Sequence, residues 1–208
     1  MKELFKLVML LLFATNMILI TSCSDDDDPM MEEEMMEEEM ETVDPTVAAL
    51  EGSWVLAQTV AALAVGPAEG SADWWFNSEE DLATRSCQFD DVWTFGTDGS
   101  LSIELDDETW IEAWQGVDPE ACAAPVAPHV SGDYTYEANE SSITINGEGA
   151  FIGLAKVING GELSAEGTAV PASRTYSILE MSTDPKTMKL GIAIAGEGNW
   201  TFNLVEKQ

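Results

Sequence analysis

The sequence predicts an all-β domain, an antiparallel meander of about eight strands that forms either a closed barrel or a two-sheet sandwich. Two observations support this prediction. Segments of alternating apolar and polar residues recur between turn-forming residues through residues 46–208, and no long stretch there has apolar residues at helical spacing. An acidic segment that we expect to be disordered precedes the domain.

The first residues, 1–22, have the pattern of a secretory signal peptide. Lys2 and Lys6 precede an almost wholly apolar run over residues 7–20, which is shorter than the ~20 residues that a membrane span needs. Residues 20–23 resemble the lipobox of bacterial lipoproteins, which implies that Cys23 is lipidated and begins the mature chain. The alternative is an ordinary cysteine near a cleavage site that lies elsewhere.

Residues 23–45 are predicted to be an acidic tether rich in Met and Glu. Positions 24–44 hold 12 Asp and Glu and no Lys or Arg, and such a block of like charge repels itself and stays extended. The run from Asp25 to Asp28 resembles the surface-export signal of Bacteroidetes lipoproteins, which implies an outer-membrane lipid anchor that faces the cell exterior. Alternatives are a plain spacer on a periplasm-facing lipoprotein, a transient Met-containing helix and a metal-scavenging tail.

The β domain is predicted to occupy residues 46–208. Its clearest hairpin joins residues 92–95 to 100–105 through Gly96-Thr97-Asp98-Gly99, since Asp-Gly favours a tight turn. Further hairpins join 134–136 to 142–145 and 174–181 to 188–194, and strands at 54–60 and 200–205 open and close the domain. A short helix is predicted over 78–83 with Ser78 as its N-cap, and a loop over the Pro- and Ala-rich residues 119–128.

Cys87 and Cys122 are the two cysteines of this domain. An even pair in an exported chain favours a disulfide, which would pin the loop at 119–128 to the sheet and stabilise the domain by about 3–4 kcal/mol. The alternative is a pair of free, buried thiols.

The charge balance excludes one class of partner and disfavours another. With 39 Asp and Glu against 8 Lys and Arg, the chain has a formal charge of −31 and lacks the clustered cations that nucleic acid binding needs. The domain alone has 26 acidic and 6 basic residues, which disfavours anionic ligands and suits neutral or cationic ones.

Neither catalysis nor a resident cofactor is expected. The chain has one histidine, His129, so multi-histidine zinc sites and Ser-His-Asp triads lose their usual partners. The many carboxylates would form glycosidase-like pairs by chance, and no acid/base pair can be singled out. We therefore assign no catalytic residue, no metal ligand and no cofactor.

Tryptophan is the unusual feature of the domain, which holds all seven. Three of them alternate with apolar residues in predicted strands and are expected in the core: Trp54, Trp93 and Trp200. Trp74 and Trp75 lie in a loop next to Phe76, where three consecutive rings cannot all enter one core.

Trp110 and Trp114 flank Glu112, and on either a strand or a helix the two indoles would share one face. Indole faces stack on pyranose rings, while Glu112 and Gln115 would hydrogen-bond sugar hydroxyls. The alternative is that both indoles pack inward across a hairpin. The predicted ligand-binding residues are Trp74, Trp75, Trp110, Glu112, Trp114 and Gln115.

Two resemblances extend these expectations. The run Leu50-Glu51-Gly52-Ser53-Trp54 is similar to the Gly-x-Trp opening of lipocalin-like domains, which implies an eight-stranded barrel. Residues 52–205 resemble an accessory β domain of Bacteroidetes surface lipoproteins linked to polysaccharide utilisation, which implies no enzymatic role. The second resemblance rests on Val65-Gly66-Pro67, Asp73-Trp74-Trp75, residues 80–87, 89–91, 110–116, 122–129 and 159–163.

These features predict a non-catalytic outer-membrane lipoprotein that binds a neutral polysaccharide or oligosaccharide of the β-glucan type. Its other expected partners are the membrane, through the lipid anchor, and outer-membrane glycan-uptake proteins. One alternative is a lipocalin-like carrier of a small hydrophobic ligand inside the barrel. Another is an interaction protein with a filled core.

Lipidation at Cys23 can be tested directly. Mass spectrometry of the mature N-terminus should find a diacylglyceryl or triacyl group on Cys23, because residues 20–23 have the lipobox pattern. Replacing Asp25 to Asp28 by neutral residues should keep the lipid but remove the accessibility of the protein to an external protease. A soluble product without lipid would contradict the first expectation, and unchanged accessibility the second.

Overall fold

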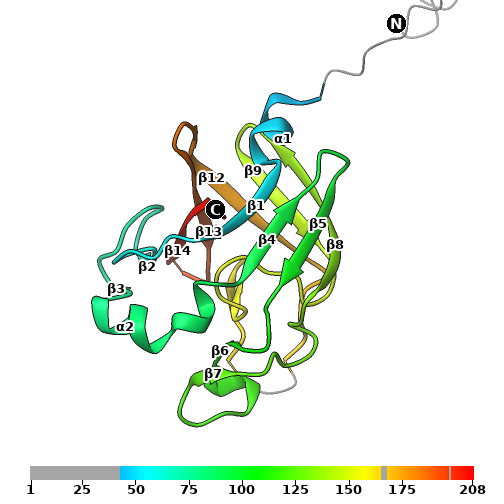
Figure 1. Ribbon diagram of the computed structural model, residues 1–208. Coiled ribbons are helices and arrows are strands. Elements are labelled where there is room, and N and C mark those ends of the chain that lie inside the picture. Colours follow the sequence, from blue (N-terminus) through cyan, green and yellow to red (C-terminus); the bar gives the residue numbers. More distant parts are fainter. Residues whose placement is uncertain (1–42, 165–167, 197) are drawn as a thin grey trace, which may run out of the picture. The chain divides into compact units, whose positions relative to one another are not determined.

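Figure 1 shows the computed structural model, which describes residues 43–164, 168–196 and 198–208. The predicted signal peptide, Cys23, the export signal and the tether up to residue 42 lie outside the described residues. Asp44 and Pro45, predicted as the end of the tether, belong to helix α1 (Pro45–Leu50), in which Asp44 is the N-cap and Pro45 takes the first helical position.

Eight antiparallel strands form a closed barrel (Figure 1). Their order around the barrel follows the chain, and the last strand pairs with the first, so the structure is a barrel and not a sandwich. This meander is consistent with a lipocalin-like fold. The strands are β1 (Gly52–Leu56), β4 (Val92–Phe95), β5 (Ser100–Glu104), β8 (Gly132–Asn139), β9 (Ser142–Asn146), β12 (Ser173–Thr183), β13 (Lys186–Ala193) and β14 (Asn199–Glu206).

The three predicted hairpins are confirmed as β4–β5, β8–β9 and β12–β13. Alternation places every second side chain in the core, as in β9, where Ile143 and Ile145 are buried between half-buried neighbours. The turn between β4 and β5 includes Gly99 at φ 82°, a backbone angle that glycine adopts without a Cβ clash.

The first predicted strand ends earlier than expected, at Leu56 rather than residue 60. The chain leaves the sheet over residues 57–62 and returns as β2 (Leu63–Gly66). Asn203 of β14 spans this excursion, since its C=O accepts from Ala57 N–H at 2.9 Å and its N–H donates to Ala62 C=O at 2.8 Å. Strand β14 thus pairs with β1 near one end and with β2 near the other.

The barrel wall divides at this point. β1 pairs on its far side with β4, whereas β2 pairs with the short strand β3 (Trp75–Phe76). Asn77, which is fully buried, holds the returning chain: its Oδ1 accepts from Leu63 N–H at 2.8 Å and its Nδ2 donates to Thr59 C=O at 3.0 Å. β1 and β2 thus continue to different neighbouring strands on the side away from β14.

The predicted short helix is confirmed as α2 (Glu79–Thr84), and it follows β3 at the division of the wall. Ser78 is its N-cap and forms a capping box with Asp81, whose carboxylate accepts from Ser78 N–H at 2.7 Å. A single turn of 3-10 helix, η1 (Ser86–Gln88), then leads into β4.

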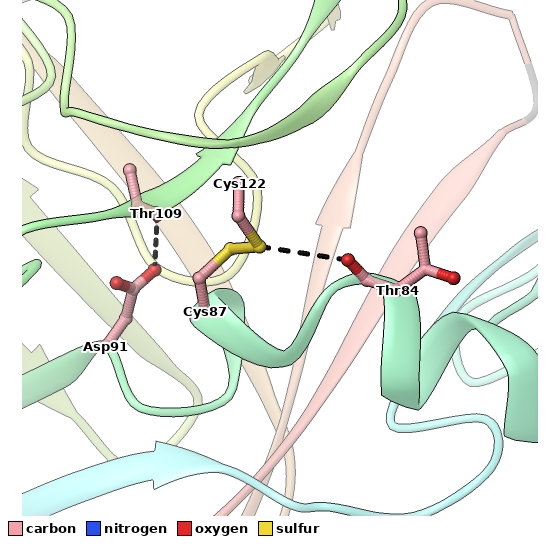
Figure 2. The surroundings of a disulfide bond; sticks show 5 residues. All are labelled: Thr84, Cys87, Asp91, Thr109 and Cys122. Atoms are coloured by element: carbon pink, nitrogen blue, oxygen red, sulfur yellow. Dashed lines mark hydrogen bonds between the residues drawn. A yellow bond between two sulfur atoms is a disulfide. The ribbon is translucent and has the colours of Figure 1, made fainter.

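The predicted disulfide between Cys87 and Cys122 is confirmed (Figure 2). It joins η1 to strand β7 (Ala121–Ala123), which pairs with β6 (Thr109–Ile111). The prediction of a loop over 119–128 was therefore wrong for residues 121–123, because β6 provides a partner strand that a high Pro and Ala content does not reveal. Beside the disulfide, Thr109 Oγ1 donates to the buried Asp91 carboxylate at 2.8 Å.

The segment of residues 149–155, here called the plug, fills one end of the barrel and is wholly buried (Figure 1, yellow). Strands from around the barrel hold it: Trp93 Nε1 of β4 donates to Phe151 C=O at 2.6 Å, and Ile152 N–H donates to Tyr176 Oη of β12 at 2.9 Å. The short strands β10 (Val157–Ile158) and β11 (Gly161–Glu162) follow it.

The core contains all three tryptophans predicted for it, Trp54, Trp93 and Trp200. It also contains one buried cation, Arg174 of β12, whose Nη2 donates to Ala155 C=O of the plug at 2.9 Å. The interior of the described barrel is therefore packed with strand side chains together with the plug.

Gly153 of the plug provides a test of this packing. A Cβ on Gly153 would lie 2.3 Å from the Phe202 ring, so Gly153→Ala should lower the free energy of unfolding by roughly 1–3 kcal/mol through overpacking. Gly160→Ala is the matched control, because Gly160 has a similar positive φ but a Cβ on it would meet no other atom within 4 Å. Urea unfolding measures both variants, and equal losses would contradict a tightly packed plug.

Candidate functional site

A cleft of about 420 Å³ lies beside β2, β3 and β14, next to the plug. We call it the tryptophan cleft, since three indole rings line it. They come from separate parts of the chain: Trp74 and Trp75 from the segment at β3, and Trp200 from β14. The full lining is Val65, Trp74, Trp75, Arg85, Leu154, Lys156, Glu162, Ile194 and Trp200.

The three rings differ in exposure. Trp74 is 56% exposed, Trp75 is half-buried and Trp200 is only 5% exposed. The rings of Trp75 and Trp200 lie 5.8 Å apart with 59° between their planes. The cleft therefore combines one projecting indole with two tilted indoles that form an apolar wall.

Two cations lie against these rings. The Arg85 guanidinium is 5.4 Å from the centroid of Trp75 and 4.3 Å from that of Trp110, and Lys156 Nζ is 5.3 Å from the centroid of Trp200. Such cation–π contacts stabilise the ring positions by about 0.5–1 kcal/mol each where they are partly exposed. The two cations thus line the cleft together with the rings that they contact.

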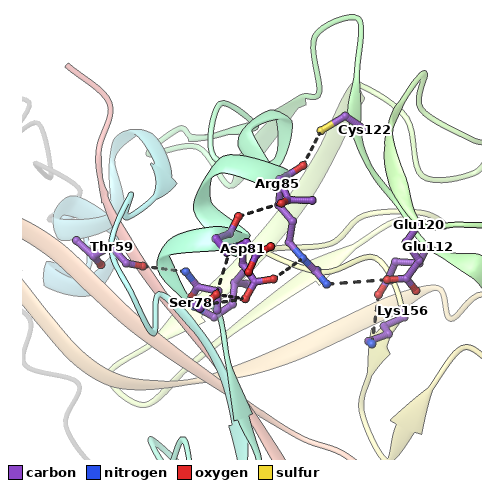
Figure 3. Close-up of polar contacts among 12 residues, drawn as sticks. Thr59, Ser78, Asp81, Arg85, Glu112, Glu120, Cys122 and Lys156 are labelled. Carbon is purple, nitrogen blue, oxygen red and sulfur yellow. Dashed lines mark hydrogen bonds and ion pairs between the residues drawn. The ribbon is translucent and has the colours of Figure 1, made fainter.

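Carboxylates compensate both cations, as Figure 3 shows. Arg85 lies 4.0 Å from Asp81 and 3.9 Å from Glu120, and Lys156 Nζ lies 3.2 Å from Glu112 Oε1. The cleft therefore presents no uncompensated positive charge to a ligand from its described lining.

Glu162 supplies a carboxylate at the rim of the cleft. Its Oε1 accepts from Trp200 Nε1 at 2.5 Å, which orients the indole. A carboxylate has about four acceptor sites, so Glu162 keeps capacity for hydroxyl donors of a ligand.

The structure separates the six predicted ligand-binding residues into three groups. Trp74 and Trp75 line the tryptophan cleft. Trp110 and Glu112 are only 7% and 2% exposed, so they lie beneath the surface, and the predicted outward platform is wrong for both. Trp114 and Gln115 line a second cleft.

A local break in the backbone explains this separation. β6 ends at Ile111, and Glu112 becomes the N-cap of a 3-10 helix, η2 (Ala113–Gln115). Trp110 and Trp114 therefore share neither a strand nor an α-helix, and the expected common face does not form. Trp110 packs against Arg85, whereas Trp114 packs edge-on against His129 with 5.4 Å between ring centroids.

Glu112 has a structural position instead of a surface one. Its Oε2 accepts from Trp114 Nε1 at 3.1 Å, and its Oε1 pairs with Lys156. Burial raises the pKa of Glu112, and the nearby Lys156 and the Trp114 bond oppose that rise. The carboxylate thus links the tryptophan cleft to Trp114.

Several cleft residues were not predicted: Val65, Arg85, Leu154, Lys156, Glu162, Ile194 and Trp200. The prediction that Trp200 lies in the core is correct, since the side chain is mostly buried. The alternating pattern of its strand does not indicate that one side of the ring also borders a cleft. Arg85 and Glu162 lie in segments that carry the family resemblance, and this was the one available signal for them.

The second cleft, here called the Pro128 cleft, has a volume of about 220 Å³. Its lining is Trp114, Gln115, Val126, Ala127, Pro128, His129, Thr168 and Val170. His129 is buried, and Arg174 Nη2 donates to its Nε2 at 3.1 Å, so this nitrogen is the acceptor of a neutral imidazole. Burial chiefly, with repulsion from Arg174, lowers the pKa of His129 from 6.5 to about 4.

Comparison with known proteins adds few constraints. No protein-family model matches the chain, and no curated protein matches it. Within residues 43–164, 168–196 and 198–208, no three His, Cys, Asp or Glu side chains are grouped as metal ligands. The helices in this part of the chain are all too short or too polar to cross a membrane.

The buried His129 predicts a pH dependence of stability. Between pH 4 and 6.5 the unfolded chain protonates this histidine and the folded chain does not, so stability should rise with pH across that window. His129→Gln keeps an acceptor for Arg174 but cannot titrate, and its stability should rise less. Urea unfolding at several pH values within the window compares the two proteins, and parallel curves would contradict a neutral, buried His129.

Proposed function

We propose that this protein is a cell-surface lipoprotein that binds a neutral glycan of the β-glucan type in the tryptophan cleft, without catalysis. The observation that carries the proposal is the convergence of Trp74, Trp75 and Trp200 on one cleft together with Glu162. Indole faces match the apolar faces of pyranose rings, and a carboxylate at the rim accepts from hydroxyls. A mostly apolar lining with few polar groups is typical of small-molecule sites.

Charge supports a neutral ligand. Arg85 and Lys156, the two cations of the cleft, are paired with carboxylates and stacked on indoles. The rest of the domain is strongly acidic, with 26 acidic against 6 basic residues, and would repel a polyanion. A neutral sugar chain needs no free cation in the cleft and is not repelled by the acidic surface.

The filled barrel favours this proposal over a carrier of small hydrophobic ligands. Such a carrier needs space between the strands, as in lipocalins. Here the plug lies in one end of the barrel, with Phe151, Ile152 and Leu154 buried among strand side chains. A ligand inside the barrel would have to displace this segment.

Non-catalytic binding is part of the proposal. Glu112, the buried carboxylate next to the cleft, is held by Lys156 and Trp114. His129 is buried against Arg174, in the other cleft. Neither group is arranged as a free acid or base facing the tryptophan cleft.

The cellular location of the protein is proposed from its sequence. The lipobox-like residues 20–23 and the acidic run that follows indicate an outer-membrane anchor facing the exterior. A glycan-binding domain on a tether there would collect sugar chains for outer-membrane glycan-uptake proteins, its expected partners.

Affinity electrophoresis of the purified protein tests the proposal. Gels that contain a neutral β-glucan, such as laminarin, lichenan or hydroxyethylcellulose, should retard the protein, and gels that contain alginate should not. Trp74→Ala should leave folding unchanged, because Trp74 is 56% exposed, and should weaken binding by about 2 kcal/mol.

Phe76→Ala is the matched control, because Phe76 is 44% exposed on the same strand segment but does not line the cleft. Trp110→Ala should instead lower the free energy of unfolding by roughly 3–5 kcal/mol, since Trp110 is buried. The absence of retardation by every neutral glucan, or equal effects of the Trp74 and Phe76 variants, would refute the proposal.

A further inference from the structure

The Pro128 cleft has features of a sugar site that the proposed function does not use. None of its eight lining residues carries a charge, since His129 is neutral, although the domain around it is strongly acidic. The lining combines an indole, an imidazole and the amide of Gln115 with the apolar Val126 and Pro128. This set suits a neutral ring with hydroxyl groups.

The size of the cleft suits a small part of a ligand. Its 220 Å³ is below the ~300–1,000 Å³ of sites for drug-sized ligands, whereas the tryptophan cleft lies within that range. The Pro128 cleft therefore has room for little more than one ring of a larger molecule.

Glu112 connects the two clefts through direct contacts. Its Oε2 accepts from Trp114 Nε1 of the Pro128 cleft at 3.1 Å, and its Oε1 lies 3.2 Å from Lys156 Nζ of the tryptophan cleft. Lys156 in turn lies over the Trp200 ring, with 5.3 Å to the centroid. One buried carboxylate and one lysine thus separate the indole of one cleft from an indole of the other.

Gln115 is held so that its amide can serve the cleft. Its Oε1 accepts from Glu112 N–H at 3.0 Å, which orients the side chain. The amide nitrogen has two further donors for hydroxyl oxygens. The residue that orients Gln115 is therefore the one that also connects the clefts.

We infer that the Pro128 cleft is a second glycan subsite, which binds a further sugar unit of the chain that occupies the tryptophan cleft. This inference rests on the proposed function and narrows it: a glycan segment long enough to reach both clefts should bind more tightly than a disaccharide, which occupies the tryptophan cleft alone. The protein then selects for polymer length as well as for neutral sugars.

Titration calorimetry of the purified full-length protein tests the second subsite. The probes are the disaccharide and the hexasaccharide of the β-glucan that retards the protein in the gels. Val126→Glu is the main variant, because Val126 is 36% exposed, so that the protein should still fold, and because it would place a carboxylate in an uncharged cleft. It should weaken hexasaccharide binding by about ten-fold and leave disaccharide binding unchanged.

Two further variants complete the test. Ala127→Glu, at an exposed position of the same lining, should show the same selective loss, and Val60→Glu, an exposed substitution that lines neither cleft, should bind both probes normally. Hexasaccharide affinity that is kept in Val126→Glu but lost in Trp74→Ala would overturn the second subsite alone. No binding by the unmodified protein would overturn the proposed function and this inference together.

Discussion

Strand β14 has to pair with two segments at once, and the arrangement of the candidate site depends on this hydrogen-bonding constraint. Asn203 bonds to Ala57 and Ala62 on either side of the excursion, so one residue of β14 faces six of the opposing chain. Beyond this point β2 turns to β3 instead of β4. The divided wall exposes one side of Trp200 and places it beside Trp75.

Scarce cations stabilise the aromatic rings at this division. The domain has six basic residues, and Arg85 and Lys156 both lie against indoles. Each is paired with carboxylates, including Glu112, whose burial would be costly without Lys156. The disulfide joins η1, directly after Arg85, to β7, the partner strand of Trp110. The positive charges of Arg85 and Lys156 are therefore compensated within the cleft, where they contact the rings.

The plug contributes both to the packed interior of the barrel and to the lining of the tryptophan cleft. Phe151 and Ile152 fill the space between the strands, and Leu154 of the same segment lines the tryptophan cleft. A packed interior makes the wall rigid, and rigid elements hold rings in fixed positions for binding. The candidate binding surface consequently lies where β2 and β14 meet the plug, next to a filled interior, although the topology resembles that of folds that bind ligands within.

Local signals in the sequence determined the hairpins and the Ser78-capped helix, because alternation, turn residues and caps act over a few neighbouring residues. The predicted loop position was wrong for Trp75, which lies in β3 because the distant strand β2 gives it a partner. The disulfide was predicted from the cysteine count and from the signal-peptide pattern of residues 1–22. Only tertiary structure decided that the meander closes through β1 and β14, that Trp110 and Glu112 are buried, and that Trp200 borders the cleft. Alternation states which side of a strand faces inward, but not which distant segments cover it. Lys156 and Glu162 join Trp75 and Trp200 only through long-range strand pairing and plug packing, for which no short stretch of sequence holds a signal.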